Sequence, residues 1–219
     1  EGGRTGQNGV AKEIAELRKG WMDEWTHLLN SDEVPIGAYR VIGELERVLD
    51  KENSVVTHDA GAPRDSIIPF YTATTPHSYI GWGKTTHLGY GIPLMIGAKL
   101  ADPTKFCLNF MGDGAFGMSG LDIETAVRAG APITTVVLHN GGMATYPGGY
   151  PTANELFGLT HMGGDYAKIA EGLGAVGITV TQPSEVGPAL VKAQQLNRDG
   201  QTVLLDIHTN LEGRRSNFL

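Results

Sequence analysis

The sequence has one cysteine, no run of basic residues and no apolar stretch long enough to span a membrane. Its single thiol, at Cys107, excludes an internal disulfide. The net charge of -7 and the lack of a lysine- or arginine-rich run argue against a nucleic-acid partner. Without a membrane-spanning run or a signal-peptide pattern, we expect a soluble, cytoplasmic protein with no membrane association.

Helix-like and strand-like segments alternate along the chain from Pro35 onward. Short β-branched or apolar runs predict strands at 54–57, 105–110, 133–138, 175–180 and 202–208. Helices are expected at 35–49, 89–101, 119–129, 165–172 and 184–197, with a glycine-rich loop before the fourth. This alternation is typical of a doubly wound parallel sheet with helices on both faces, so the predicted fold class is α/β. Residues 1–34 are expected to form an N-terminal tail and linker helix, and residues 35–219 the domain itself.

Two polar motifs follow two of the predicted strands. A Gly-Asp-Gly sequence at 112–114 follows strand 105–110 in a turn that glycine makes easily, and His-Asn-Gly-Gly at 139–142 follows strand 133–138. The helix between them is predicted to have Ser119 as its N-cap. A right-handed crossover makes the two strands parallel, so their carboxyl ends lie on one edge of the sheet. We therefore expect Asp113 and Asn140 to converge.

A carboxylate and an amide oxygen beside glycine-rich backbone suit a hard cation such as Mg²⁺, which takes its remaining ligands from phosphates and water. Exposed N–H groups and a helix dipole favour the phosphate oxygens themselves. The two motifs together predict a metal-bridged diphosphate site.

Two other interpretations use some of the same residues. Gly112, Gly114 and Gly117 also spell G-x-G-x-x-G, the dinucleotide fingerprint, but the second strand ends in His139 and Asn140 rather than in an acidic residue. Asp113 would also repel a pyrophosphate that brings no metal. A ligand-free Asx turn explains Asp113 alone and leaves the second motif unexplained. The metal-diphosphate interpretation is favoured over both.

The paired motifs resemble those of thiamine diphosphate (ThDP) enzymes of the acetolactate synthase, oxalyl-CoA decarboxylase and 2-hydroxyacyl-CoA lyase group. These enzymes carry Gly-Asp-Gly, a spacer similar in length to residues 115–138, and then Asn-Asn. His139 stands where the group has its first Asn, and Asn140 matches the second. The resemblance implies that Mg²⁺ is held by Asp113, by the side-chain oxygen of Asn140 and by the backbone carbonyl of Gly142.

Residues 86–99 resemble the group's segment that lies under the cofactor. Leu88 takes the place of the bulky apolar residue that bends the cofactor, which makes it the implied catalytic residue, and the Thr86 carbonyl and Leu88 N–H would meet the aminopyrimidine. At 58–63 the group has polar side chains that reach the diphosphate, whereas Ala62 and Pro63 stand there in this chain, so only backbone contacts are expected. The implied cofactor-binding set is Ala62, Thr86, Leu88, Gly112, Asp113, Gly114, Ala115, Phe116, Asn140, Gly142, Met143 and Ala144.

Three histidines, His87, His139 and His161, are candidates for proton handling, although a lone histidine is more often a hydrogen-bonded structural residue. The cofactor carries the carbon chemistry in such enzymes, and the protein contributes orientation and acid-base help.

The resemblance implies a ThDP- and Mg²⁺-dependent lyase or transferase, a carboligase acting on 2-oxo acids or 2-hydroxyacyl-CoA thioesters. The alternatives are a simple 2-oxo acid decarboxylase and a non-catalytic, diphosphate-binding regulatory subunit. The group also uses a pyrimidine-binding domain, whose Glu completes the site. We find one α/β domain in this sequence, so that second domain is expected from the same polypeptide or another subunit, in a homodimer or tetramer.

Overall fold

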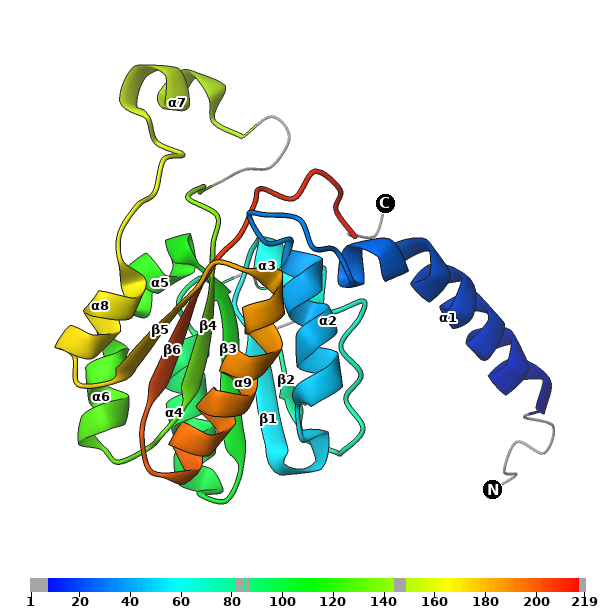
Figure 1. Cartoon of the computed structure of the whole chain (residues 1–219), viewed down its shortest axis with the longest axis horizontal. Coiled ribbons are helices and arrows are strands. Elements are labelled where there is room, and N and C mark those ends of the chain that lie inside the picture. The colour runs from blue at the N-terminus through cyan, green and yellow to red at the C-terminus, as the bar shows by residue number, and fades with distance from the viewer. Residues whose placement is uncertain (1–7, 82–84, 86, 144–148, 217–219) are drawn as a thin grey trace.

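A computed structural model describes residues 8–81, 85, 87–143 and 149–216. Its centre is a six-stranded, all-parallel sheet with strand order β2-β1-β3-β4-β6-β5 (Figure 1). The strands are β1 (Ser54–His58), β2 (Tyr79–Ile80), β3 (Phe106–Gly112), β4 (Thr134–His139), β5 (Val176–Val180) and β6 (Val203–His208). All their carboxyl ends lie on one edge of the sheet, because every pairing is parallel.

Helices cover both faces of the sheet, which confirms the predicted doubly wound α/β fold (Figure 1). One face is covered by α2 (Ala38–Val48), α3 (Ala62–Ile67) and α9 (Pro183–Arg198). The other is covered by α4 (Gly91–Ala101), α5 (Asp113–Ser119), α6 (Asp122–Arg128) and α8 (Tyr166–Gly172). The remaining helices are α1 (Asn8–Leu29), the 3-10 turn η1 (Lys51–Asn53) and α7 (Pro151–Phe157).

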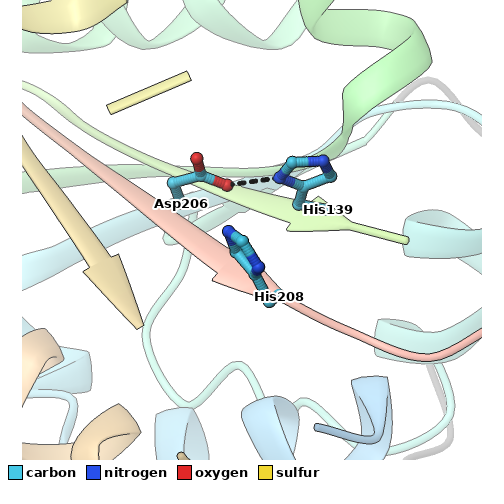
Figure 2. Close-up of side chains that lie close together, drawn as sticks. All are labelled: His139, Asp206 and His208. Carbon is cyan, nitrogen blue, oxygen red and sulfur yellow. Dashed lines mark hydrogen bonds and ion pairs between the residues drawn. The ribbon is translucent and has the colours of Figure 1, made fainter. Parts of the chain in front are cut away.

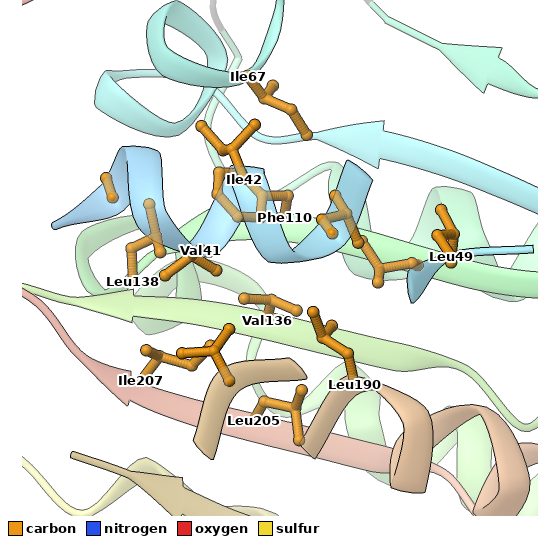
Figure 3. Close-up of a cluster of buried hydrophobic side chains, with 14 of the residues drawn as sticks. Val41, Ile42, Leu49, Ile67, Phe110, Val136, Leu138, Leu190, Leu205 and Ile207 are labelled. Carbon is orange, nitrogen blue, oxygen red and sulfur yellow. The ribbon is translucent and has the colours of Figure 1, made fainter. Parts of the chain in front are cut away.

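The core divides into two layers because successive strand residues point to opposite faces. In β3, Phe110 belongs to the layer under α2 and α9, whereas Met111 belongs to the layer under α4 and α6. Figure 3 shows the first layer, where Val136 and Leu205 from the sheet meet Leu190 from α9. Both layers are continuous and apolar, so the sheet is a rigid platform for the loops at its carboxyl edge.

Helix α1 contacts the domain through its C-terminal half, from Arg18 onward. Trp25 is 2% exposed and its ring lies 4.9 Å from that of Tyr39, whereas Leu17, two turns earlier, is 69% exposed. Figure 1 shows the helix projecting away from the sheet toward the N-terminus. Gly43 of α2 permits this docking, because a Cβ there would lie 2.3 Å from the carbonyl oxygen of Leu29.

The expected helices and strands are present within a few residues, but the local geometry after β3 differs from the expectation. Gly112 has φ -93° and Gly114 lies inside α5, so neither uses the left-handed conformation that the predicted turn requires. Ser119 ends α5 instead of capping the next helix, which begins at Asp122. An acidic first residue and the burial of Phe116 stabilise α5 despite its glycines.

Helices α3 and α7 and strand β2 were not expected from the sequence pattern. Both helices are short and carry a proline in their first turn, and α7 ends at Gly158 in the left-handed conformation. Within the described residues, no helix combines the length and apolar character needed to cross a membrane.

Replacing Gly43 with Ala should lower the free energy of unfolding by about 1–3 kcal/mol, because the new methyl group overlaps the Leu29 carbonyl. Gly97→Ala, on the exposed side of α4 with open space around it, is the matched control and should stabilise the chain by up to about 1 kcal/mol. Urea unfolding of the two variants measures both effects. Equal stabilities would contradict the close approach of α1 to α2.

Candidate cofactor site at the carboxyl edge of the sheet

A cavity of about 290 Å³ opens at the carboxyl edge, between the ends of β1, β3 and β4. Asp113 follows β3 directly and Asn140 follows β4 directly, and both line the cavity. The two strands are in register at this point, with Gly112 opposite Leu138. The described lining residues are Ala60, Gly61, Ala62, Pro63, Leu88, Gly112, Asp113, Gly114, Ala115, Asn140, Gly142, Met143 and Tyr150.

The Asp113 carboxylate joins the start of α5 to the loop after β4. Its Oδ1 accepts a hydrogen bond from the Gly114 N–H at 2.8 Å, and its Oδ2 accepts one from the Gly141 N–H at 2.8 Å. Burial raises the pKa of Asp113 above its usual value, although these backbone donors and nearby His139 oppose that rise. Among the described residues, no lysine or arginine forms an ion pair with Asp113. A cation bound here would supply the missing positive charge.

Asn140 sits at the start of a tight loop. Its side-chain oxygen accepts a hydrogen bond from the Gly142 N–H at 2.9 Å, and the intervening Gly141 has φ +68°, a conformation that favours glycine. The loop is braced from outside by hydrogen bonds from the Met143 N–H to the Thr160 carbonyl and from the Met162 N–H to the Gly141 carbonyl. Each carboxylate or amide oxygen has a second lone pair, so these oxygens can still bind a metal.

The fit to a hard cation therefore rests on the donor set. An anionic carboxylate, an amide oxygen and the backbone of a glycine-rich loop stand at one cavity, and Mg²⁺ characteristically takes one or two protein carboxylates and completes its shell with water and phosphate oxygens.

Two comparisons with known proteins bear on this site. The family described as thiamine pyrophosphate enzyme, C-terminal TPP binding domain, matches residues 59–207. The chain belongs to this family. Thiamine pyrophosphate is another name for ThDP, so the family supports ThDP as the cofactor and confirms the resemblance drawn from the motifs.

Similar proteins include two kinds of enzyme. A sulfoacetaldehyde acetyltransferase of Alcaligenes xylosoxydans is 31% identical, over 90% of this chain and 36% of its own length. An acetolactate synthase large subunit of Mycobacterium tuberculosis is 31% identical, over 87% of this chain and 35% of its own. The mitochondrial acetolactate synthase catalytic subunit of Saccharomyces cerevisiae is 28% identical, over 81% of this chain and 26% of its own length. The chain thus spans about a third or less of the length of these relatives.

Most of the cofactor-binding residues expected in this TPP-binding domain line the one cavity. The exceptions are Phe116, which packs against Tyr166 in the core with ring centroids 5.2 Å apart, and Thr86 and Ala144, which lie outside the described residues. Of the histidines suggested for proton handling, His87 and His161 are exposed and are not among the described lining residues. His139 is instead hydrogen-bonded to Asp206, with 2.9 Å between Nδ1 and Oδ1.

Asp59 is a supporting residue that the sequence analysis did not single out. It is fully buried, and its carboxylate accepts hydrogen bonds from the N–H groups of Ala60 at 2.8 Å and of Gly89 and Gly91 at 3.0 Å. These bonds hold the loop that carries Leu88, and the first turn of α4, against the end of β1. An acidic residue directly after a buried strand was the available sequence signal.

A larger cavity, of about 630 Å³, lies at the opposite edge of the sheet, beside the start of β3. Its buried amine already has a partner, because Lys99 Nζ donates to the Lys105 carbonyl at 2.7 Å. None of the expected site residues lines it.

Asp59→Asn should cost about 1.5–3 kcal/mol of stability. A carboxylate accepts the Gly89 and Gly91 N–H groups with its two oxygens, whereas an amide has only one oxygen acceptor. Hydrogen exchange at the Gly89 and Gly91 amides should also accelerate. Asp23→Asn, at an exposed ion pair on α1, is the control and should change stability by less than about 1 kcal/mol. Unchanged amide protection in Asp59→Asn would show that the carboxylate does not hold this loop.

Proposed function

We propose that this chain binds the diphosphate of ThDP through a Mg²⁺ ion held by Asp113, the side-chain oxygen of Asn140 and the backbone carbonyl of Gly142. The observation that carries the proposal is the buried Asp113 carboxylate, which has no lysine or arginine partner among the described residues and shares a cavity with Asn140. When bound, ThDP supplies an electron sink for bond making and breaking at a carbonyl carbon.

Each part of the cavity has a separate task in this proposal. Asp113 neutralises the cation, and its hydrogen bonds to Gly114 and Gly141 fix the direction of both carboxylate oxygens. Asn140 is oriented by the Gly142 N–H. Leu88 and Met143 provide an apolar wall, which keeps water away and strengthens the electrostatic interactions inside.

A second protein surface is needed to complete the site. About 290 Å³ is at the lower limit of ligand pockets, which typically measure about 300–1,000 Å³. Asp113 is also the only carboxylate among the described lining residues, so no acidic side chain remains for acid-base work elsewhere on the cofactor. We infer that a pyrimidine-binding domain, from the same polypeptide or another subunit, supplies that group.

For the whole enzyme we propose a lyase or transferase acting as a carboligase on 2-oxo acids, with 2-hydroxyacyl-CoA thioesters as the other substrate class. The relatives named above as acetolactate synthase and sulfoacetaldehyde acetyltransferase support a transferase. A simple 2-oxo acid decarboxylase is the second candidate. A non-catalytic regulatory subunit is disfavoured, because both Asp113 and Asn140 are retained. A homodimer or tetramer and a cytoplasmic location stay predictions from the sequence.

Asp113→Ala and Asp113→Asn should each weaken Mg²⁺-dependent ThDP binding by at least about 10²-fold, because both remove the metal's anionic ligand. Calorimetric titration with ThDP in excess Mg²⁺, repeated with a chelator, measures the effect. Asp122→Ala, on the next helix and away from the cavity, should bind as the unmodified chain does. Unchanged affinity in both folded Asp113 variants would refute the metal assignment.

Leu88→Ala should lower turnover of the assembled enzyme by about 10²-fold, because a displaced cofactor loses its orientation toward the reacting atoms. Leu88 is only half-buried, so the accompanying loss of stability should be small. Leu94→Ala, a half-buried leucine of α4 that packs against the same core layer and does not line the cavity, should lose a similarly small amount of stability and keep normal activity per folded molecule. Normal activity per folded molecule in Leu88→Ala, with a clear loss of stability, would make Leu88 an ordinary core residue.

A further inference from the structure

A second cluster of metal-ligating side chains lies on the sheet itself, on β4 and β6. Asp206 and His208 are two residues apart on β6 and therefore share a face of the sheet, and His139 is the direct partner of His208 on β4. One ligating atom from each of the three side chains lies within 4.8 Å of the other two. Figure 2 shows a ring nitrogen of His208 pointing toward the hydrogen-bonded pair of Asp206 and His139.

Asp206 is a buried charge that needs a cation. It is 1% exposed in a strand whose other residues before His208 are apolar. Its Oδ1 is 2.9 Å from His139 Nδ1, and its Oδ2 accepts a hydrogen bond from the Tyr166 N–H at 3.2 Å. No lysine or arginine of the described chain pairs with it. His139 gives this carboxylate a positive partner only when its ring is protonated, and a metal ion between the three side chains would supply the positive charge in either case.

The chemistry of this donor set differs from that of the cavity lined by Asp113 and Asn140. Two imidazoles and one carboxylate suit Zn²⁺ and similar transition metals, whereas Mg²⁺ prefers oxygen ligands alone. Zinc ligands lie about 2.0–2.2 Å from the metal, and hence roughly 3.3 Å from one another. The pair formed by His139 and Asp206 already has this spacing to within a few tenths of an ångström, and His208, the most exposed of the three, can close the remaining gap by rotating its ring.

The surroundings also support the three ligands. The Tyr166 N–H orients the carboxylate through its second oxygen, and the Tyr166 ring packs edge-on against His139 with centroids 4.7 Å apart. Outer contacts of this kind fix the direction of metal ligands and raise affinity.

We propose that His139, Asp206 and His208 form a site for a divalent transition-metal ion such as Zn²⁺, with water in the open coordination position. This proposal does not depend on ThDP binding. It concerns a different ligand set, although His139 and Asn140 are consecutive residues.

The test is a Zn²⁺ titration of the chelator-stripped full chain, in competition with a chromophoric chelator and in excess Mg²⁺. His208→Ala and Asp206→Asn are compared with His27→Ala, which removes an exposed histidine on α1, and with Asp113→Ala. Replacing Zn²⁺ with Co²⁺ then reports the ligand set through the visible absorption of the bound ion. His208 lies at the accessible end of β6, so its variant tests the site without disturbing the core.

We expect the unmodified chain to bind one Zn²⁺ ion. The dissociation constant for Zn²⁺ should be at least 100-fold higher in His208→Ala and Asp206→Asn than in the controls His27→Ala and Asp113→Ala. The Co²⁺ spectrum should change in His208→Ala and not in Asp113→Ala. Failure of the unmodified chain to bind Zn²⁺, displacement by Mg²⁺, or equal affinity in His208→Ala and His27→Ala would each overturn the proposal. Loss of ThDP binding in Asp113→Ala with retained Zn²⁺ binding would leave both assignments standing.

Discussion

Three buried carboxylates hold the loops at the carboxyl edge of the sheet. Asp59 follows β1, Asp113 follows β3 and Asp206 lies near the end of β6, and each is 2% exposed or less. Each accepts at least one backbone N–H from a segment distant in the sequence: Gly89 and Gly91, Gly141, and Tyr166 respectively. Loop backbone that would otherwise need water is thereby tied to a rigid platform. Two of these carboxylates, Asp59 and Asp113, thereby fix the loops of Leu88 and Asn140, which line the cavity.

The same arrangement concentrates negative charge, because none of the three carboxylates forms an ion pair with a lysine or arginine of the described chain. In the described part of the chain, lysine and arginine pair with other acidic residues, both at exposed positions on α1, α6 and α8 and at half-buried positions on α2 and α3. Backbone N–H groups carry only partial charges, so an ionised carboxylate in this environment favours a bound cation. Metal binding and local folding are therefore linked: an ion that binds the folded edge and not the unfolded chain stabilises that edge.

The sequence was informative wherever the signal was local. Alternating strands and helices predicted the parallel sheet, and two polar motifs after strands predicted which residues meet at its edge. The sequence was less informative where tertiary packing overrides the intrinsic helix propensity of the residues. Helix α5 forms through glycines that disfavour a helix, because burial of Phe116 compensates. The roles of Asp59 and Asp206 were missed because their partners lie 30 or more residues away along the chain and only the fold brings them close.

His139 lies between the two proposed metal sites, next to Asn140 in the chain and beside Asp206 on the neighbouring strand. In the ThDP motif that this sequence resembles, an Asn stands at the position of His139, and an Asn side chain has no cationic form that could pair with a buried carboxylate. In this chain the imidazole turns toward Asp206 on the neighbouring strand, while the next residue, Asn140, lines the cavity. Consecutive residues of one strand end thus serve opposite sides of the backbone. If ions occupied both proposed sites, thermodynamic linkage would require each ion to change the affinity of the other by the same factor. His139 is thus connected to Asp206 by its side chain and to Asn140 by the backbone.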